Sequence, residues 1–212
     1  MKTVGTLAVL LGSLGTAQAQ NWQLGARAGL AVSGLAGQNS DAPYKARLGG
    51  SAGVFARWQP GQHFSLQPEL LYTLGGYRYE SEYHHSGDLA YTTVDLHYLA
   101  LPLLAAYRWH GVFLEAGPQV SWLMCAEQRT SYSGNNYHDN VDITRYYPGF
   151  EAGAVAGAGW QRPQGLLLGL RYTRGLTELL PAAFSGYYPA RYNHSLQLYV
   201  GYTFGRATAA GH

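Results

Sequence analysis

Six ionisable side chains stand at polar positions of segments in which apolar and polar residues alternate. They are Arg27, Arg57, Glu69, Glu115, Glu151 and Arg171. A charge that is removed from water must be paired, because an isolated buried charge is costly. Since the three arginines balance the three glutamates, we expect a network of ion pairs. A polar relay or a path for small ions is the alternative for the same residues.

Two clusters that contain histidine suggest a metal site or a catalytic hydroxyl group. The first is His84, His85, Ser86 and Asp88, and the second is His138, Asp139 and Asp142. Neighbouring side chains on a strand point to opposite faces, so adjacent histidines do not form one tetrahedral ligand set. A Ser/His/Asp triad is defined by geometry, which spacing alone does not supply. We therefore predict no catalytic residue, no metal site and no cofactor, and interpret both clusters as solvated loop residues.

Tyrosine is frequent, with 18 residues in the chain, and several of them fall in polar segments expected to be loops. Exposed Tyr together with Ser, Gly and Asn is typical of recognition surfaces. The candidate binding residues are Tyr83, Tyr137, Tyr147, Tyr187 and Tyr188. They are suited to contact a glycan or a surface protein, and the alternative is that they pack the loops against one another.

The segments that carry the charges are predicted to be β-strands, because their hydrophobic pattern has a period of two. In the last segment, Leu196, Leu198 and Val200 fall on one face and Gln197 and Tyr199 on the other. A helix would mix these two sets, whereas a strand separates them. The same pattern predicts seven earlier strands, over residues 22–33, 47–58, 63–79, 91–109, 112–132, 146–160 and 165–180.

Short and long connections alternate strictly between these eight segments. Pro and Gly mark short turns at residues 59–62, 110–111 and 162–165. The polar connections near residues 34–46, 80–90, 133–145 and 181–191 are longer. An even number of strands with this rhythm is typical of transmembrane barrels, whose short turns lie in the periplasm and whose long loops lie outside. We expect Pro68, Pro102 and Pro118, which fall inside strands, to mark β-bulges.

The composition favours a membrane barrel. Only 12% of the residues are charged, whereas soluble domains carry roughly 25%. After the N-terminal segment no stretch reaches the roughly 18 apolar residues of a spanning helix. The predicted fold is therefore all-β: an eight-stranded antiparallel up-and-down transmembrane β-barrel of OmpX-like size. A soluble lipocalin-like barrel, with its apolar residues inside, is the main alternative.

The N-terminus has the pattern of an export signal. Lys2 precedes an apolar run over residues 4–14, and Ala17 and Ala19 occupy the positions that a signal peptidase reads. We predict a signal peptide at 1–19, an outer-membrane barrel domain at 20–206 and a short C-terminal tail at 207–212. The expected location is the outer membrane of a Gram-negative cell, with outer-membrane lipid as a partner and a monomeric state.

The net charge argues against nucleic-acid binding, and the cysteine content excludes an intramolecular disulfide. Removal of the signal peptide takes away Lys2 and lowers the formal net charge from +2 to +1, which argues against nucleic acid as a partner. The single cysteine, Cys125, excludes an intramolecular disulfide.

Aromatic residues gather near both ends of the predicted strands, as in the interfacial girdles of membrane proteins. The girdle expected near the short turns is Trp22, Trp58, Tyr107, Trp109, Trp160, Tyr202 and Phe204. The girdle expected near the long loops is Tyr79, Tyr91, Tyr132 and Tyr146.

Several short motifs resemble the PorT-type outer-membrane β-barrel family, which is common in Bacteroidetes. They are residues 66–72 (LQPELLY), 98–104 (YLALPLL), 115–118 (EAGP), 153–159, Arg171–Tyr172 with 175–177, and 201–204 (GYTF). The chain departs from the family in having Ala100 where Glu is frequent, and in continuing past Phe204. The resemblance implies the fold and the outer-membrane location, but little about activity.

The function expected from these observations is a structural or surface-interaction role. The Arg/Glu set would fill the lumen, and the Tyr-rich loops would offer a binding surface for an envelope protein, a surface protein or a glycan. One alternative is a component of protein secretion or envelope assembly, which the PorT resemblance implies. Another is a small membrane-embedded enzyme that modifies lipid. A water-filled solute pore is disfavoured, because eight strands leave room inside only for side chains.

Overall fold

The computed structural model describes residues 22–37, 44–82, 89–132, 135–179 and 191–204. The predicted signal peptide, the C-terminal tail and the cluster of His84, His85, Ser86 and Asp88 lie outside these residues. In this described part no helix has the length and apolar character needed to cross a membrane.

The long elements are strands. They are β1 (Trp22–Gly37), β2 (Tyr44–Trp58), β3 (Phe64–Glu82), β4 (Leu89–Trp109), β5 (Val112–Tyr132), β6 (Asn135–Asp142), β7 (Phe150–Gln161), β8 (Leu166–Gly175) and β9 (Arg191–Phe204). A single turn of 3-10 helix, η2 (Thr144–Tyr146), lies between β6 and β7.

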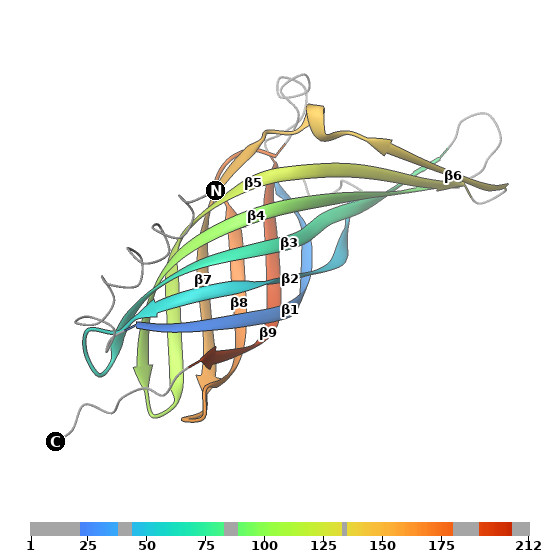
Figure 1. Ribbon diagram of the computed structural model, residues 1–212. Coiled ribbons are helices and arrows are strands. Elements are labelled where there is room, and N and C mark those ends of the chain that lie inside the picture. Colours follow the sequence, from blue (N-terminus) through green and yellow to red (C-terminus); the bar gives the residue numbers. More distant parts are fainter. Residues whose placement is uncertain (1–21, 38–43, 83–88, 133–134, 180–190, 205–212) are drawn as a thin grey trace, which may run out of the picture.

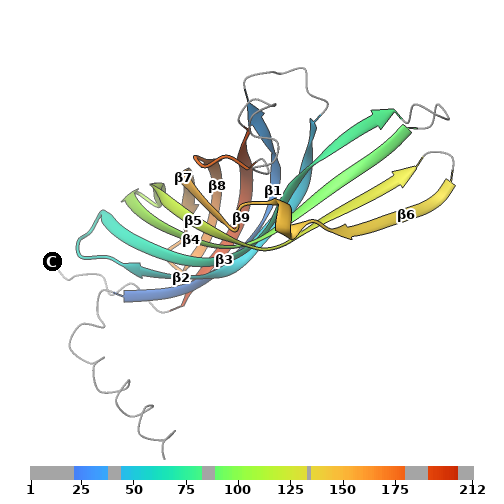
Figure 2. The same cartoon turned by 90° about the horizontal axis from the view of Figure 1, so that it is seen from above.

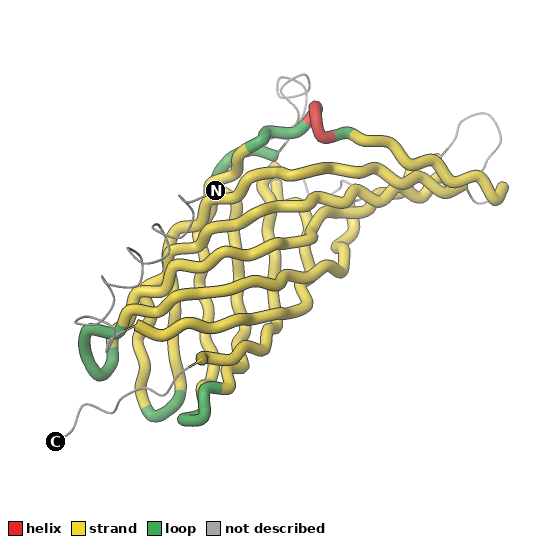
Figure 3. Tube along the Cα trace, viewed as in Figure 1, coloured by secondary structure: helices red, strands yellow, loops and turns green. Residues whose placement is uncertain are grey.

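Eight of these strands close into a ring, which the crossing ribbons of Figures 1 and 3 outline. The order runs from β4 through β3, β2, β1, β9, β8 and β7 to β5, and pairing between β4 and β5 closes it. Every neighbouring pair is antiparallel, including β1 with β9. The predicted eight-stranded up-and-down barrel is therefore confirmed.

The two faces of each ring strand have opposite character, as the period of two predicts. In β9, Leu198 is 57% exposed on the outer face, whereas the adjacent Tyr199 is buried. The outer surface carries a continuous set of exposed Leu, Val and aromatic side chains, while Arg, Glu and Gln side chains are buried. A lipocalin-like barrel would show the reverse, so this alternative is wrong.

The three predicted short turns are all present. They join β2 to β3 through residues 59–63, β4 to β5 through residues 110–111, and β7 to β8 through residues 162–165. His110 and Gly111 both have positive φ, 50° and 83°, as a two-residue hairpin turn between twisted strands requires. The three turns lie at one end of the barrel, which we call the turn end (Figure 1).

At the opposite end, the sheet continues beyond the ring. Outer parts of β3, β4 and β5 project to one side together with β6, and we call this four-stranded region the extension (Figures 1 and 2). Its strands remain paired far along their length, with Glu82 opposite Leu89 and Ala90 opposite Tyr132.

The predicted loop at residues 133–145 is therefore wrong, since it contains β6 and η2. The β5–β7 pairing ends at Trp122 and Phe150, which leaves the edge of β5 open beyond that level. β6 fills that edge, with Glu127 opposite Asp142. Its polar sequence has no alternating apolar residues, so periodicity did not reveal it. β7 also begins later than expected, at Phe150, and β8 ends earlier, at Gly175.

The bulges expected at Pro68, Pro102 and Pro118 are absent. The residue pairing keeps the same register on both sides of each proline. Register shifts occur instead between Ala46 and Gly50, between His97 and Tyr98, and between Ser131 and Tyr132. The first two lie at or near the level where the extension leaves the ring, so they accompany the bend of these strands, whereas the third lies at the far end of the extension.

Aromatic residues border the apolar outer surface at both ends. At the turn end the exposed set contains all the predicted residues: Trp22, Trp58, Tyr107, Trp109, Trp160, Tyr202 and Phe204. At the other end, Tyr72, Leu99, Trp122 and Phe150 are successive cross-strand partners, so they lie at one level. Of the residues expected there, Tyr79 and Tyr91 lie farther out on the extension, and Tyr146 lies in η2.

The inner face of the extension has its own hydrophobic cluster. Its buried members are Tyr77, Val94, Leu96, Tyr98, Ala126, Ile143 and Leu179. Ile143 follows β6 and Leu179 follows β8, so segments from two connections fold onto the same surface. We call this group the outer cluster.

Candidate functional site

The strands place the predicted charged residues inside the barrel. Arg27, Arg57, Glu69, Glu115, Glu151 and Arg171 are all buried. Glycines opposite them leave the space that these long side chains occupy. Arg27 lies opposite Gly53 and Gly201, and Gly157 lies opposite both Glu115 and Arg171.

Glu69 is the centre of an ion-pair network that joins four strands. Arg171 of β8 donates hydrogen bonds of 2.7 and 3.0 Å to the two carboxylate oxygens of Glu69. Arg27 of β1 forms a salt bridge of 3.3 Å with the same carboxylate. Arg171 also pairs with Glu115 of β5 at 2.7 Å. These four side chains are at most 4% exposed.

Polar and aromatic side chains complete this network. The amide of Gln67 donates to Glu69 at 2.7 Å, and Arg27 donates to Gln197 at 2.9 Å. The Tyr199 hydroxyl donates to Glu115 at 3.1 Å. The guanidinium carbon of Arg27 lies 3.5 Å from the centre of the Tyr199 ring, within the range of a cation–π interaction. We call the four charged residues with Gln67, Gln197 and Tyr199 the central network.

Arg57 lies closer to the turn end and has no salt bridge to a described carboxylate. It donates instead to Gln67 at 2.9 Å and to Gln161 at 3.0 Å. Arg108 donates to the same Gln161 oxygen at 3.3 Å and to the Ser65 hydroxyl. Sequence reasoning missed Arg108, although it falls on the polar face of its strand, and its charge upsets the expected balance of three arginines and three glutamates.

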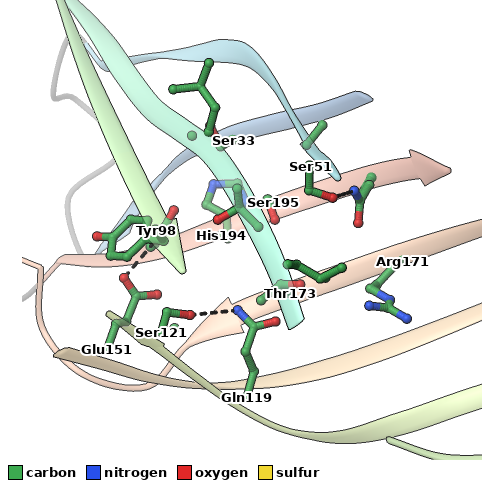
Figure 4. Close-up of a pocket in the computed structure, with 18 of the residues that line it drawn as sticks. Ser33, Ser51, Tyr98, Gln119, Ser121, Glu151, Arg171, Thr173, His194 and Ser195 are labelled. Carbon is green, nitrogen blue, oxygen red and sulfur yellow. Dashed lines mark hydrogen bonds between the residues drawn. The ribbon is translucent and has the colours of Figure 1, made fainter. Parts of the chain in front are cut away.

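Glu151 lies toward the other end and is also outside the central network. Its carboxylate interacts with Tyr98 (Figure 4) and accepts a hydrogen bond of 3.5 Å from Asn193. It lines a cavity of about 70 Å³ together with side chains such as Ser33, Thr173 and Ser195. A volume of this size has room for several water molecules.

A second ion-pair group lies where the extension begins. The carboxylate of Asp95, 1% exposed, pairs with Arg47 at 2.6 Å and with Arg129. Sequence reasoning did not select these residues, because Asp95 falls on the apolar face of its strand. Nearby, hydrogen bonds from the side chain and backbone of Thr144 lower the pKa of the exposed Asp142 carboxyl.

The structure places only some of the candidate loop residues. Tyr147 is half-buried against the outer cluster, and its hydroxyl lies 2.6 Å from that of Tyr77. Tyr83, Tyr187 and Tyr188 lie outside the described residues, as does the side chain of Tyr137 in β6. Within the described ranges, no three His, Cys, Asp or Glu residues are grouped so as to hold a metal ion.

Comparisons with known proteins agree with this architecture. The family profile described as "Outer membrane protein beta-barrel domain" matches residues 17–180. No curated protein sequence matches the chain. Among solved structures, Neisserial surface protein A is similar with a TM-score of 0.51 and 12% identity, covering 85% of this chain and 97% of its own. Ail from Yersinia pestis, in complex with the heparin analogue sucrose octasulfate, has a TM-score of 0.48 and 13% identity, covering 87% and 99%. At 12% identity the likeness to Neisserial surface protein A concerns the fold alone.

Proposed function

The chain belongs to the outer membrane protein β-barrel domain family, and from this premise we propose that it is a closed barrel with a surface-interaction role. The central network closes its lumen to solutes and ions. The extension is the part of the protein that meets a partner outside the membrane.

The observation that carries the closed lumen is the position of Glu69 between Arg27 and Arg171. These side chains come from β3, β1 and β8, so their contacts span the interior of the ring. An eight-stranded barrel has an interior about as wide as its own side chains. The network therefore leaves no continuous water column, and its paired charges hold one another in place.

A solute-uptake assay tests the closed lumen. Liposomes that contain the refolded protein are placed in isotonic solutions of small sugars, and swelling is followed by light scattering. We expect no swelling above that of empty liposomes, while a porin reconstituted in parallel serves as the positive control. Swelling that scales with the amount of this protein would contradict the proposal.

The orientation follows from the two ends of the barrel. Short turns of membrane barrels face the periplasm, and long connections face outward. The turn end of this barrel is therefore the periplasmic end, and the extension projects from the cell surface. The exposed aromatic residues at the turn end mark the interface between the outer membrane and the periplasm.

Thiol labelling of intact cells tests this orientation. Cys125 is first replaced by Ser, and a single cysteine is then introduced as Arg129→Cys on the extension or Arg162→Cys in a periplasmic turn. Both side chains are exposed. A membrane-impermeant maleimide should label Arg129→Cys in intact cells, but Arg162→Cys only after the outer membrane is opened. The reverse pattern would contradict the orientation.

The extension favours an interaction role over a purely structural one. β3, β4 and β5 have 19 to 21 residues, whereas roughly 9–11 suffice to span a membrane. The excess forms a paired sheet supported by its own hydrophobic cluster and by the Asp95 ion pairs. A component of the cell surface or of the envelope is a suitable partner for such a sheet.

The PorT resemblance implies a more specific form of this proposal, a role in protein secretion. In that form, the partner that binds the extension is a component of the secretion machinery. Shortening the β3–β4 hairpin by joining Arg78 to Thr93 through a two-residue turn removes much of the extension while retaining a natural pair. Loss of secretion with an intact barrel would support this version, and unchanged secretion would contradict it.

A further inference from the structure

The turn end of the barrel encloses a hollow with an unusual charge. It has a volume of about 490 Å³ and is lined by residues of the three short turns and the adjoining strand ends. Cavities that hold small molecules typically measure roughly 300–1,000 Å³. The lining contains Arg57, Arg108, Arg162, His63 and His110, and it includes no acidic residue.

The interior beside this hollow has more positive than negative charge. The interior side chains Arg27, Arg57, Arg108 and Arg171 are linked, directly or through glutamine side chains, to the carboxylates of Glu69 and Glu115. Both carboxylates are already bound to Arg171, and Glu69 also to Arg27. Arg57 and Arg108 therefore remain without a carboxylate partner among the described side chains.

These two guanidinium groups line the hollow and are held in place by neighbouring side chains. Both donate to one oxygen of Gln161, and Arg108 also donates to Ser65. The guanidinium carbons lie 5.3 and 5.8 Å from the ring centres of Phe55 and Phe113, respectively. Aromatic rings and neutral amides fix the position of the two charges but do not neutralise them.

A second, independent observation points to a missing ligand. Thr203 lines the same hollow, is 2% exposed, and its hydroxyl has no hydrogen-bond partner. A buried hydroxyl without a partner is costly, because it has lost its bonds to water. A ligand with several acceptor oxygens would satisfy this donor together with those of the arginines.

We propose that this hollow is a binding site for a phosphate dianion, either free inorganic phosphate or a phosphomonoester. Guanidinium groups bind phosphate oxygens through paired, charge-assisted hydrogen bonds. The two unpaired arginines match a group that carries a charge of about −1.5 to −2 at neutral pH, and a carboxylate would neutralise only one of them. His63 and His110 are exposed residues of the same lining.

The site rests on the closed interior of the proposed function, because the central network separates it from the outer end. Its placement in the periplasm rests on the proposed orientation, but the binding chemistry does not. Failure to bind phosphate would leave the solute-uptake and labelling results unaffected. Phosphate binding combined with reversed labelling would retain the site and overturn the orientation.

Isothermal titration with sodium phosphate tests the site. The full mature chain is refolded in an uncharged detergent at low ionic strength, at about pH 8, where phosphate is mainly the dianion. We expect saturable binding that sulfate competes for, while acetate binds much more weakly. Absence of saturable phosphate binding, or equal binding of acetate, would overturn the proposal.

Three variants assign the binding to the hollow. R57Q and R108Q should each weaken phosphate binding by about tenfold or more, since each removes a charge-assisted hydrogen bond. T203V, which keeps the shape of the side chain, should weaken it by about fivefold. R78Q removes the same charge from an exposed position on the extension and should leave binding unchanged.

Heat-dependent gel mobility checks that each variant is folded. If R57Q does not fold, R108Q and T203V still decide, because Arg108 is less buried than Arg57 and T203V changes no charge. If R108Q and T203V are both folded and both bind phosphate as the unmodified protein does, the proposal is overturned.

Vesicles distinguish the two sources of phosphate. The protein is reconstituted in phosphatidylcholine with or without phosphatidic acid, and binding of radiolabelled inorganic phosphate is measured. Competition by phosphatidic acid would identify a lipid headgroup as a ligand of the site. Binding that is independent of phosphatidic acid would identify a soluble phosphate compound.

Discussion

Glu69 and Arg171 are 102 residues apart in the chain, yet two hydrogen bonds of 2.7 and 3.0 Å join them inside the barrel. The contact crosses the ring from β3 to β8, which do not pair with each other. It therefore depends on closure of the whole barrel and reports on the packing of the interior.

Replacing Glu69 should strongly destabilise the barrel. Glu69→Gln leaves Arg27 and Arg171 buried with one carboxylate fewer, and breaking a buried pair costs about 3–5 kcal/mol. The free energy of unfolding in urea, with the barrel in detergent, measures the loss. Glu80→Gln is the matched control, because Glu80 pairs with Lys45 at the surface, where such pairs contribute roughly 0–1 kcal/mol. Similar losses in both variants would contradict the central role of Glu69.

The hydroxyl and the ring of Tyr199 should contribute separately. Tyr199→Phe removes the hydrogen bond to Glu115 but keeps the ring beside Arg27. We expect a loss of about 1–2 kcal/mol in the free energy of unfolding. Tyr199→Leu removes both interactions and should cost about 1 kcal/mol more. Equal losses would show that the ring contributes nothing beyond its volume.

The space above Gly157 should be essential for the network. A methyl group there would meet the Glu115 carboxylate and the Leu170 carbonyl oxygen. Gly157→Ala should therefore destabilise the barrel by about 1–3 kcal/mol through overpacking. Gly61→Ala in a turn has open space around it and should change stability by less than about 0.5 kcal/mol. A neutral Gly157→Ala variant would mean that the interior is less tightly packed than described.

Asp95 should hold the extension against the ring. Asp95→Asn removes the charge that pairs with Arg47 and Arg129. We expect faster amide hydrogen exchange in β6 and the outer part of β5, with little change in the ring strands, because the pairs lie where the extension begins. Asp139→Asn, an exposed change on β6, is the control. Unchanged exchange in the first variant would contradict the anchoring role.

The ring could be predicted from the sequence because each strand alternates strictly and each turn contains turn-forming residues. The inward position of residues such as Arg27 and Glu115 followed from the same alternation. The sequence does not predict which charged side chains form ion pairs, because the partners depend on the stagger, that is, the offset between neighbouring strands in the closed barrel. That stagger brings Arg171 to Glu69 and leaves Glu151 with Asn193.

Two other features could not be read from periodicity. β6 is polar apart from Tyr137 and Val141, and it forms because the edge of β5 is left open beyond Trp122. Asp95 lies on the face of its strand that is apolar within the ring, and it is buried because Arg47 and Arg129 reach it from two other strands. In both cases the cause is a tertiary contact with a distant part of the chain.

Single-channel recording tests the closed lumen most directly. The purified protein is inserted into a planar lipid bilayer, beside a variant in which Arg27, Glu69, Glu115 and Arg171 are all replaced by Ser. The account predicts no steady ion current through the unmodified protein, and a small ohmic current through the variant once it is shown to be folded. A steady current of the same size through both proteins would contradict the proposal that the central network closes the barrel.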